Sequence, residues 1–542
     1  MQINFGILCD AGVLESWQLK SLNQLLAVAD VRAVLLINQR APAAHTSPLP
    51  DNLASLPSIT LTDTAPRGGQ TTLAKPAVER LRSQNLDFIL SFLTERCPPE
   101  LLESARYGVW AYHVGDWTHY RGNPVGFWEV YEAEPVSAAL LVRLQREVDA
   151  VVVLREGHLR TNLLSFAGNR EQLLARITHW PSQVCIDMGN GITDRLTSQP
   201  LVSTAAERRV PTRAQLFNYK CRIAARMVCV GLRSLFRHDQ WNVGRIDRPI
   251  ASFLRPSRPA SVQWLRSPNR SEFYADPFGA WRDGRLTILY EHFNYRTNRG
   301  TIAAIEPARS AVGAAVQIGP QPAVHLSYPY LIEVEGRLLC IPESHEAAEI
   351  GVYEIERFPD RWVKVANLLE GIPIVDATLF RHEGNWWLAG SEPTTKGTTC
   401  ELHLWHASAI TGPWRPHIGN PVKIDIRSAR PGGTPFYEDG VLYRPAQDCS
   451  RAYGGRVIIN RVLTLTTSAF RETQVATVEP DRTGRYPAGL HTLSQVGDIT
   501  LIDGKRTIFS PAEFRRVLMH YLRKARGACA RLICLMRVLE RT

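Results

Sequence analysis

The chain has 542 residues, 44% of them hydrophobic, which is enough for roughly two to four globular domains with cores of ordinary size. Its 63 Lys and Arg residues outnumber its 52 Asp and Glu residues, so the net charge of +11 predicts an anionic partner such as nucleic acid, an anionic lipid surface or a phosphorylated substrate. The start of the chain lacks the pattern of a secretory signal, no apolar run is long enough to span a membrane, and the ten cysteines form no Cys-x-x-Cys pair. We therefore expect a cytoplasmic protein without a disulfide framework and without a metal site.

Residues 1–190 alternate apolar segments of strand length with amphipathic segments of helix length, which predicts an α/β domain. The expected strands are 3–9, 31–37, 86–92, 136–144 and 151–159. The expected helices are 14–29, 74–84, 97–102, 125–131 and 170–178. The segment 41–70 is rich in Pro, Ala, Ser and Thr and is predicted to be a surface loop. No Gly-x-Gly-x-x-Gly follows the first strand, so a dinucleotide is not indicated.

A histidine and two turns follow one another at the end of a predicted strand. His113 ends the apolar stretch that begins at Val109, and Gly115-Asp116 and Tyr120-Arg121-Gly122 lie in the loop that follows. Open α/β sheets place ligand sites at the carboxyl ends of their strands, so this loop is the first candidate site. Asp149 follows later, in the turn between two strands that are predicted to pair.

This pattern resembles the folate-dependent formyltransferases, the family of the methionyl-tRNA and sugar-amine formyltransferases. The family pattern is a strand ending in Asn-x-His, a Ser-Leu-Leu-Pro loop, a turn like Tyr-Arg-Gly and a later Asp, and here His113, Tyr120-Arg121-Gly122 and Asp149 take the matching places. The resemblance covers the first third of the chain and implies a doubly wound sheet that binds 10-formyltetrahydrofolate near Tyr120, Arg121 and Gly122. It also implies that His113 polarises the formyl oxygen, while Asp149 orients the histidine and accepts a proton.

Two departures from the family pattern bear on the chemistry. Ala111 stands where the family has asparagine, and the loop at 115–118 reads Gly-Asp-Trp-Thr instead of Ser-Leu-Leu-Pro. Loss of one oxyanion donor typically lowers the rate about 100- to 1,000-fold. Asp116 could take over a proton-transfer role, but a carboxylate cannot donate to an oxyanion unless it is protonated. An altered active enzyme and a fold kept as a binding scaffold therefore both stay open.

Residues 191–250 form a basic connector, and residues 508–542 form a tail of the same character. In both segments Arg and Lys interleave with large apolar residues, which predicts basic amphipathic helices. The pattern extends from Arg213 to Arg237 in the connector and from Arg515 to Arg537 in the tail. Each helix could be a linker packed between domains with its cations in water, or a helix lying on an anionic membrane surface.

Residues 251–507 hold a fivefold repeat of strand, tight turn and strand. The turn glycines are residues 284, 336, 384, 440 and 497, so successive repeats are 52, 48, 56 and 57 residues apart. Turns of the Asp-Gly type predict β-hairpins, and each interval has room for two more strands. The repeat therefore predicts a five-bladed β-propeller.

The first strand of each blade lines the central channel of a propeller, so several polar side chains are expected near its axis. They are Asp276, Ser327, Asp376 and His491 from first strands and Glu291, Glu343 and Gln447 from second strands. The set is similar to that of five-bladed glycoside hydrolases and sucrases, which use three carboxylates as nucleophile or base, acid and pKa modulator, here Asp276, Asp376 and Glu343. The propeller also resembles the N-terminal part of plant glucosamine inositolphosphorylceramide transferases, whose catalytic domain is separate, and by that resemblance it would be an accessory. Turn capping and hydrogen bonding within the channel are equally open roles for these carboxylates.

Three functions follow from these features. The favoured interpretation is folate-dependent N-formyl transfer to an amino sugar of a cell-surface glycan or lipid-linked precursor, on the inner membrane face, with the propeller binding the sugar. The alternatives are a propeller enzyme that cleaves or transfers a glycosyl group, with the α/β domain as scaffold, and a non-catalytic glycan- or lipid-binding protein. Ala111 favours the alternatives, whereas His113 with Asp149 favours formyl transfer. The expected partners are a carbohydrate or a nucleotide- or lipid-linked sugar and an anionic membrane; nucleic acid is not favoured, because no aromatic and basic platform for single strands stands out.

Overall fold

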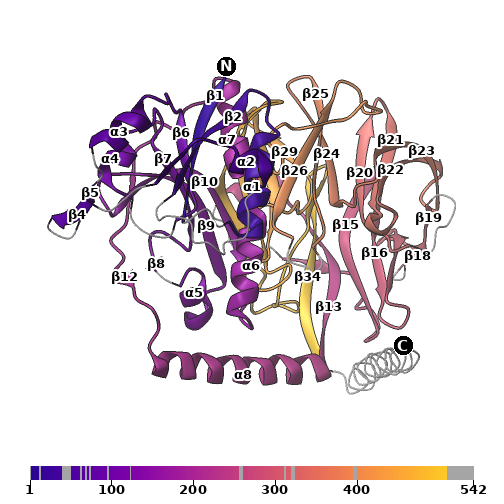
Figure 1. Cartoon of the computed structure of the whole chain (residues 1–542). Coiled ribbons are helices and arrows are strands. Elements are labelled where there is room, and N and C mark those ends of the chain that lie inside the picture. The colour runs from indigo at the N-terminus through magenta and orange to yellow at the C-terminus, as the bar shows by residue number, and fades with distance from the viewer. Residues whose placement is uncertain are drawn as a thin grey trace, which may run out of the picture. The chain divides into compact units, whose positions relative to one another are not determined.

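The computed structural model divides into two compact units, Met1–Tyr219 and Lys220–Thr542 (Figure 1). The structure describes residues 2–10, 14–38, 50–60, 64–67, 70–72, 75–93, 97–122, 124–255, 261–310, 313–318, 324–394 and 399–509. Nearly all of the predicted helical tail at 508–542 and about half of the predicted surface loop at 41–70 lie outside the described residues. The described part of that loop is not irregular, because it contains a helical turn at Asp51–Ala54 and strands at Ser58–Thr60 and Thr64–Arg67.

The first unit is built on a mixed sheet of eight strands in the order β11-β10-β9-β7-β6-β1-β2-β3. The strands from β7 to β3 run parallel, and the pairings from β7 through β9 and β10 to β11 are antiparallel. The strands are β1 Ile3–Cys9, β2 Val31–Asn38, β3 Ser58–Thr60, β6 Phe88–Ser91, β7 Val109–Val114, β9 Val136–Leu144, β10 Ala150–Arg160 and β11 Leu201–Val202. Two short ladders lie outside this sheet: β4 Thr64–Arg67 with β5 Gln70–Thr72, and β8 Arg121–Gly122 with β12 Glu207–Arg208.

Helices cover both faces of this sheet. On one face, α3 (Lys75–Arg82) and α4 (Pro99–Leu102) place Leu81 and Leu101 in one core cluster with Val109 of β7. On the other face, Ser21 of α1 (Ser16–Leu26) is hydrogen-bonded to Tyr112 at 2.7 Å, and Tyr112 points away from Val109 because side chains alternate along a strand. The remaining helices are α2 Asp51–Ala54, α5 Phe127–Glu132, α6 Phe166–Ile177 and α7 Trp180–Gly189, of which α6 and α7 contact α1.

Each strand and helix expected in residues 1–190 has a counterpart in the structure, and α7 and the short α2 are additional helices that were not expected. The central strands are apolar and buried, as is typical of parallel strands covered on both faces. The assignment of this unit to the formyltransferase fold remains a prediction.

The second unit contains five β-sheets that succeed one another along the chain, which confirms the predicted five-bladed propeller. The first blade is β15 Glu272–Arg282, β16 Arg285–Asn294, β17 Arg299–Ile305 and β18 Ala314–Ala315. The second is β20 Ser327–Val334, β21 Arg337–Glu343, β22 Glu349–Arg357 and β23 Arg361–Glu370, with β19 Gln317–Ile318 at its edge. The third is β24 Val375–His382, β25 Asn385–Ser391, β26 Glu401–Ala407 and β27 Arg415–Pro416, with β28 Lys423–Ile424. The fourth is β29 Phe436–Glu438, β30 Val441–Asp448, β31 Arg456–Leu465 and β32 Phe470–Val478.

The fifth blade joins the two ends of the propeller. It contains β33 Leu493–Val496, β34 Ile499–Phe509, β13 Arg237–Ile246 and β14 Gln263–Trp264. β13 precedes the first blade in sequence, yet it pairs with β34 along its whole length. The expected boundary at residue 250 therefore placed a propeller strand in the connector, whereas α8 (Arg213–Phe236) supplies the expected basic helix.

Two backbone features of the repeat position the channel residues. Both residues of Asp283-Gly284, Glu335-Gly336, Glu383-Gly384 and Asp439-Gly440 have positive φ, as type I′ hairpin turns require, which confirms these predicted turns. Asp276, Tyr328 and Asp376 have φ of 50°, 43° and 54°, and each lies at a bulge in the first strand of its blade. A bulge redirects a side chain, so these three residues occupy equivalent positions at the start of three blades.

Candidate functional site

Five carboxylates from four blades meet in the propeller channel: Asp276, Glu291, Glu343, Asp376 and Asp503. None has more than 6% of its surface exposed. Asp503 Oδ2 accepts a hydrogen bond from the backbone N–H of Asp276 at 3.2 Å, and Glu343 Oε2 accepts one from that of Asp376 at 3.0 Å. A second-strand carboxylate of one blade thus holds the first-strand bulge of the next blade. Burial, together with the charges of all four other carboxylates, raises the pKa of Glu291 well above its ordinary value.

His491 lies between two of these carboxylates. Its Nδ1 is 2.6 Å from Asp503 Oδ2 and its Nε2 is 3.4 Å from Asp276 Oδ1. Burial alone would lower the pKa of His491, but the charges of Asp503 and Asp276 raise it above the ordinary value. Burial raises the pKa of Asp276 to about 7, although His491 opposes the shift. Burial would also raise the pKa of Asp503, but His491 and the backbone N–H groups of His491 and Thr492 hold it below its usual value.

On the second and third blades, the carboxylates of Glu343 and Asp376 are bonded to basic and amide side chains. Glu343 Oε1 is 2.8 Å from His345 Nδ1, and this bond with the charge of Arg430 keeps the pKa of Glu343 below its usual value, although burial would raise it. Arg430 donates to Asp376 Oδ2, which also accepts a hydrogen bond from Gln447 Nε2 at 2.9 Å. Burial raises the pKa of Asp376, and Arg430 opposes that shift.

The channel therefore contains carboxyl groups of two kinds. Asp276 and Glu291 retain a proton to higher pH than an ordinary carboxyl group, while Glu343 and Asp503 ionise more readily. Carboxyl groups whose pKa values are pushed apart can divide the roles of general acid and of base or nucleophile. Glycoside cleavage and glycosyl transfer need such a pair.

Aromatic rings border the same carboxylates. The ring of Trp241 lies 4.1 Å from that of His491, and the ring of Tyr453 lies 5.4 Å from it. The Arg430 guanidinium sits 5.1 Å from the centre of the Tyr453 ring. The Tyr453 residue is 39% exposed, although burial of its hydroxyl raises the pKa of that group well above the ordinary value. An exposed ring beside a few convergent polar groups is typical of small-molecule sites.

The structure brings six of the seven predicted channel residues into or beside this cluster: Asp276, Glu291, Glu343, Asp376, Gln447 and His491. Ser327 is the exception. It pairs with Glu343 across the hairpin, and the equivalent of Asp276 and Asp376 is Tyr328, whose buried hydroxyl lies 3.0 Å from Thr378 Oγ1. The predicted channel residue of the second blade was therefore wrong by one position, and adjacent residues of a strand point to opposite faces.

Asp503, Arg430 and Tyr453 are channel residues that the sequence interpretation missed. Asp503 had a signal in the repeat: Glu291, Glu343 and Gln447 each follow their turn glycine by seven residues, and Asp503 follows Gly497 by six. Arg430 and Tyr453 lie in loops outside the repeated pattern, so no spacing pointed to them.

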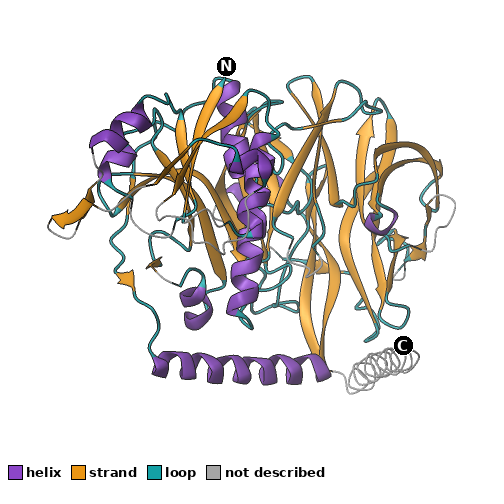
Figure 2. Cartoon of the chain, in the orientation of Figure 1, coloured by secondary structure: helices purple, strands orange, loops and turns teal. Residues whose placement is uncertain are grey.

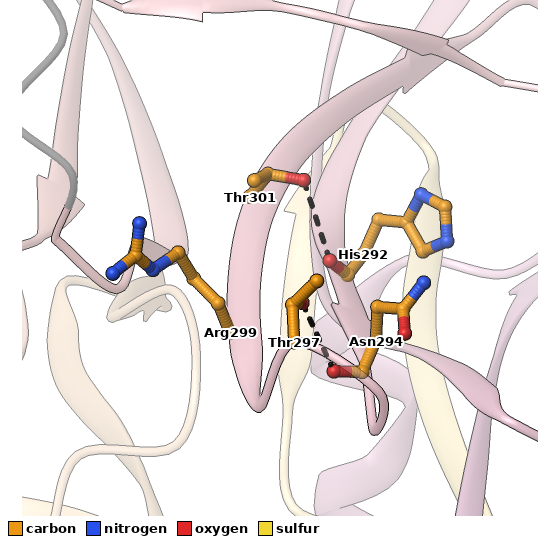
Figure 3. A pocket seen from close by; sticks show the side chains of 5 residues that line it. All are labelled: His292, Asn294, Thr297, Arg299 and Thr301. Carbon is orange, nitrogen blue, oxygen red and sulfur yellow. Dashed lines mark hydrogen bonds between the residues drawn. The ribbon is translucent and has the colours of Figure 1, made fainter.

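A polar surface pocket of about 540 Å³ lies on the first blade, lined by His292, Asn294, Thr297, Arg299 and Thr301 (Figure 3). Two threonines brace its hairpin: Thr301 Oγ1 donates to the backbone oxygen of His292 at 3.4 Å, and Thr297 Oγ1 to that of Asn294 at 3.3 Å. His292 directly follows Glu291 in β16, so the pocket and the carboxylate cluster lie on opposite faces of this strand.

In the first unit, His113 lies at the carboxyl end of β7, where the sequence placed it. The ring is hydrogen-bonded to the backbone carbonyl of Tyr120, and its Nε2 is buried without a partner. Burial lowers the pKa of His113 to about 4 and raises that of Glu129 to about 7. Glu129 Oε1 is also buried without a partner, and both atoms lie 3.5 Å from the point where a β-carbon of Gly115 would be. The neutral histidine thus faces a carboxyl group of raised pKa across a glycine.

The predicted pairing of His113 with Asp149 is wrong. Asp149 Oδ1 instead lies 2.5 Å from Arg121 Nη1, and the Asp149 side chain is 60% exposed. The physical reason is that Asp149 sits in the exposed turn before β10, where the fixed guanidinium of Arg121 reaches it. Gly122 meets a backbone constraint, because a β-carbon there would come within 2.2 Å of the carbonyl oxygen of Arg208 in β12.

Asp116 stabilises its own loop. Its Oδ1 accepts hydrogen bonds from the backbone N–H of Thr118 at 2.8 Å and from the Thr118 hydroxyl at 2.6 Å. Burial would raise the pKa of Asp116, but these bonds hold it below its usual value. Tyr120 donates to Glu132 Oε2 at 2.8 Å. Folate binding by Tyr120, Arg121 and Gly122, and catalysis by His113 or Asp116, stay predictions.

Comparison with known proteins bears on the propeller. Residues 257–488 match the family model of the N-terminal part of glucosamine inositolphosphorylceramide transferase 1. The transferase of this name from Arabidopsis thaliana is 33% identical over 305 residues, which are 53% of this chain and 38% of the relative. The one from Oryza sativa subsp. japonica is 31% identical over 266 residues, 46% of this chain and 36% of the relative. The predicted resemblance of the propeller is confirmed, and the chain spans little more than a third of the length of these relatives.

Solved structures align with parts of this chain at low scores. A structure from the GH130 family of mannoside phosphorylases aligns at 10% identity with a TM-score of 0.33, covering 44% of this chain and 90% of that chain. Phosphoribosylglycinamide formyltransferase from Anaplasma phagocytophilum aligns at 13% identity with a TM-score of 0.29, covering 38% of this chain and all of that chain. Neither likeness carries an argument about this chain.

Proposed function

We propose that the propeller acts on a glycosyl group bound in its channel, cleaving it from its donor or transferring it to an acceptor. One observation carries this proposal: buried carboxyl groups of one channel have pKa values pushed in opposite directions. Asp276, with a pKa of about 7, holds a proton that an ordinary aspartate would have lost. Glu343 is ionised at the same pH because His345 and Arg430 favour its charge.

The chemistry assigns each group a role. Asp276 donates its proton to the glycosidic oxygen of the leaving group as the bond from the anomeric carbon to that oxygen breaks. Glu343 either attacks the anomeric carbon or takes the proton of the acceptor hydroxyl, whose oxygen forms the new bond. His491, held by Asp503, lies where it can return a proton to Asp276. Asp376, paired with Arg430, acts as the charge that sets the pKa of its neighbours.

The substrate class is a carbohydrate attached to an anionic carrier. The matched relatives are named for glucosamine and inositolphosphorylceramide. The net charge of +11 suits an anionic substrate as well. We therefore place a lipid-linked sugar ahead of a free oligosaccharide.

A non-catalytic glycan-binding propeller is the second candidate. It is favoured by the extent of the match, because the family model describes an N-terminal part and the aligned segment covers 38% of the Arabidopsis thaliana relative. In that case the channel carboxylates hold a sugar by hydrogen bonds without turning it over. Because Asp149 is paired with Arg121, the expected pairing of His113 with Asp149 no longer supports formyl transfer. Binding of 10-formyltetrahydrofolate remains an untested prediction.

Turnover by channel variants distinguishes these functions. The full chain is incubated with aryl glucosaminides and related aryl glycosides, with and without an inositol phosphate acceptor, and the released phenol is measured. Asp276→Asn and Glu343→Gln should each lower turnover at least about 100-fold, as expected for loss of an acid or base. Glu333→Gln, an exposed carboxylate on β20, is the control and should leave turnover unchanged. Sugar binding without turnover would support the binding module, and neither binding nor turnover would refute both.

A further inference from the structure

α8 is a helix whose charge is of one sign. Its 24 residues, Arg213–Phe236, include no Asp or Glu, and its basic residues are Arg213, Lys220, Arg222, Arg226 and Arg233. Figure 2 shows it as one uninterrupted helix. Helices of soluble proteins usually mix both signs on their exposed face, whereas the composition of this helix is complementary to an anionic surface.

The same helix exposes large apolar side chains. The exposed fractions are 41% for Leu216, 71% for Phe217, 57% for Met227, 61% for Val228, 53% for Val230 and 57% for Leu232. Six of the twenty large hydrophobic residues that are exposed in the described part of the chain therefore lie on one helix. A concentration of this kind marks an interaction surface rather than ordinary scattered exposure.

Helical geometry separates the two sets. Residues advance by about 100° each, so the six exposed apolar residues fall in an arc of about 200° that runs from Val230 through Leu216 and Met227 to Phe217, Val228 and Leu232. Arg222, Arg226 and Arg233, spaced by four and seven, cluster within about 40° opposite the middle of that arc. Lys220 lies within the apolar side, where its long aliphatic stem can pack while its ammonium reaches outward.

We propose that α8 binds the surface of an anionic membrane, with its apolar side between the lipid head groups and its cations beside the phosphates. No helix in the described part of the chain is long and apolar enough to cross a membrane. An amphipathic helix of about 36 Å with arginines opposite large apolar residues lies in the plane of the interface instead. The surface charge of an anionic leaflet complements a helix that carries only cations.

Two other occupants of the apolar side are disfavoured by charge. A second copy of α8 would bring together two helices that each carry five cations and no acidic residue. The tail at 511–542 is itself basic, with Arg515, Arg516, Arg523, Lys524 and Arg526 in its first half, so it would also repel α8. Of these three occupants, only the lipid surface supplies both apolar depth and negative charge. If the proposed function holds, this contact would bring the channel to a lipid-linked substrate, but vesicle binding does not depend on that function.

Vesicle co-sedimentation of the full chain tests the proposal. The protein should pellet with vesicles of phosphatidylcholine and phosphatidylglycerol, release with added salt, and bind pure phosphatidylcholine weakly. Lys220→Gln with Arg233→Gln should weaken binding on the order of fivefold per cation, and Phe217→Ser with Val228→Ser should weaken it further. Arg285→Gln with Arg471→Gln, two exposed arginines on propeller strands, gives a variant of equal charge that should bind like the wild type.

Two exposed cysteines on α8 give a second measurement that does not depend on variants of the binding residues. Cys221 precedes Val228 by seven residues and shares its side, whereas Cys229 follows Arg222 by seven and shares the arginine side. In chains with Cys529→Ser and Cys534→Ser, and with either Cys221→Ser or Cys229→Ser, a polarity-sensitive dye is placed on the remaining helix cysteine. Cys97 should react slowly, because burial raises its pKa to about 11.

The dye should shift to shorter wavelength on anionic vesicles when it is on Cys221, and shift less on Cys229. Equal binding to neutral vesicles, no binding to either kind, or unchanged binding by the α8 variants would each overturn the proposal. So would self-association of the lipid-free protein that the α8 variants abolish, since it would assign the apolar side to a second copy.

Discussion

Replacement of Asp503 by asparagine should destabilise the propeller in a pH-dependent way. Asp503 is fully buried and lies 2.6 Å from His491 Nδ1. Removing one partner of a buried ion pair typically costs about 3–5 kcal/mol. Because about 1 kcal/mol shifts Tm by about 2–4 °C in a unit of this size, the transition of the propeller should move down by at least about 6 °C.

The pH dependence follows from the two pKa shifts. The pKa of folded His491 is above its ordinary value of 6.5, so its stabilisation is complete below that pH and is lost as pH rises through the folded value. The pKa of Asp503 is below its ordinary value of 3.8, so its stabilisation persists above that pH and is lost only on strong acidification. The difference in Tm between wild type and variant should therefore be larger near pH 6 than near pH 9.

Differential scanning calorimetry at both pH values measures these shifts. Asp498→Asn, an exposed aspartate in the β33–β34 turn of the same blade, is the control and should shift neither transition. A change in Tm of less than about 2 °C for Asp503→Asn, equal at the two pH values, would show that Asp503 and His491 are not a buried charged pair.

Three further outcomes are expected. Burial raises the pKa of Glu129 to about 7 from 4.5, so the stabilisation that protonated Glu129 gives the folded state is lost as pH rises through 7. Glu129→Gln should therefore raise Tm at about pH 8 but not at about pH 5, as measured by thermal unfolding. The buried N–H of Gly433 donates to the Tyr328 hydroxyl at 2.9 Å, and Tyr328→Phe removes that acceptor. The free energy of unfolding measured by denaturant titration should fall by about 1–3 kcal/mol. No change would contradict the role of Tyr328 in the second blade. Calorimetric titration with 10-formyltetrahydrofolate should show no heat of binding if the first unit is a scaffold, and tight binding weakened by His113→Ala would restore formyl transfer.

The sequence predicted the number of blades because each blade carries its own signal. The glycine of a type I′ turn needs positive φ, and Gly284, Gly336, Gly384 and Gly440 repeat that need at nearly constant intervals. Spacing from these glycines also located most channel residues. Tyr328 precedes Gly336 by eight residues, just as Asp276 and Asp376 precede their turn glycines, so the same spacing predicts Tyr328. The expectation of Ser327 was wrong by one position.

Other parts of the site could not be predicted for physical reasons. β13 joins the fifth blade through hydrogen bonds to residues more than 250 positions away, and no local pattern reports such a pairing. The partner of Asp149 depends on where Arg121 points, which is set by the contact of β8 with β12 rather than by sequence spacing. Arg430 reaches Asp376 from a loop that lies outside the repeated pattern of strand, turn and strand.

The central claim is that the propeller channel holds the glycosyl group. A crystal structure of the full chain soaked with a glucosaminyl inositol phosphate tests it most directly. The account predicts a sugar ring between the carboxyl groups of Asp276 and Glu343, beside the exposed ring of Tyr453. Density for the sugar in the first unit or in the polar pocket of the first blade, with the channel free of it, would contradict the account.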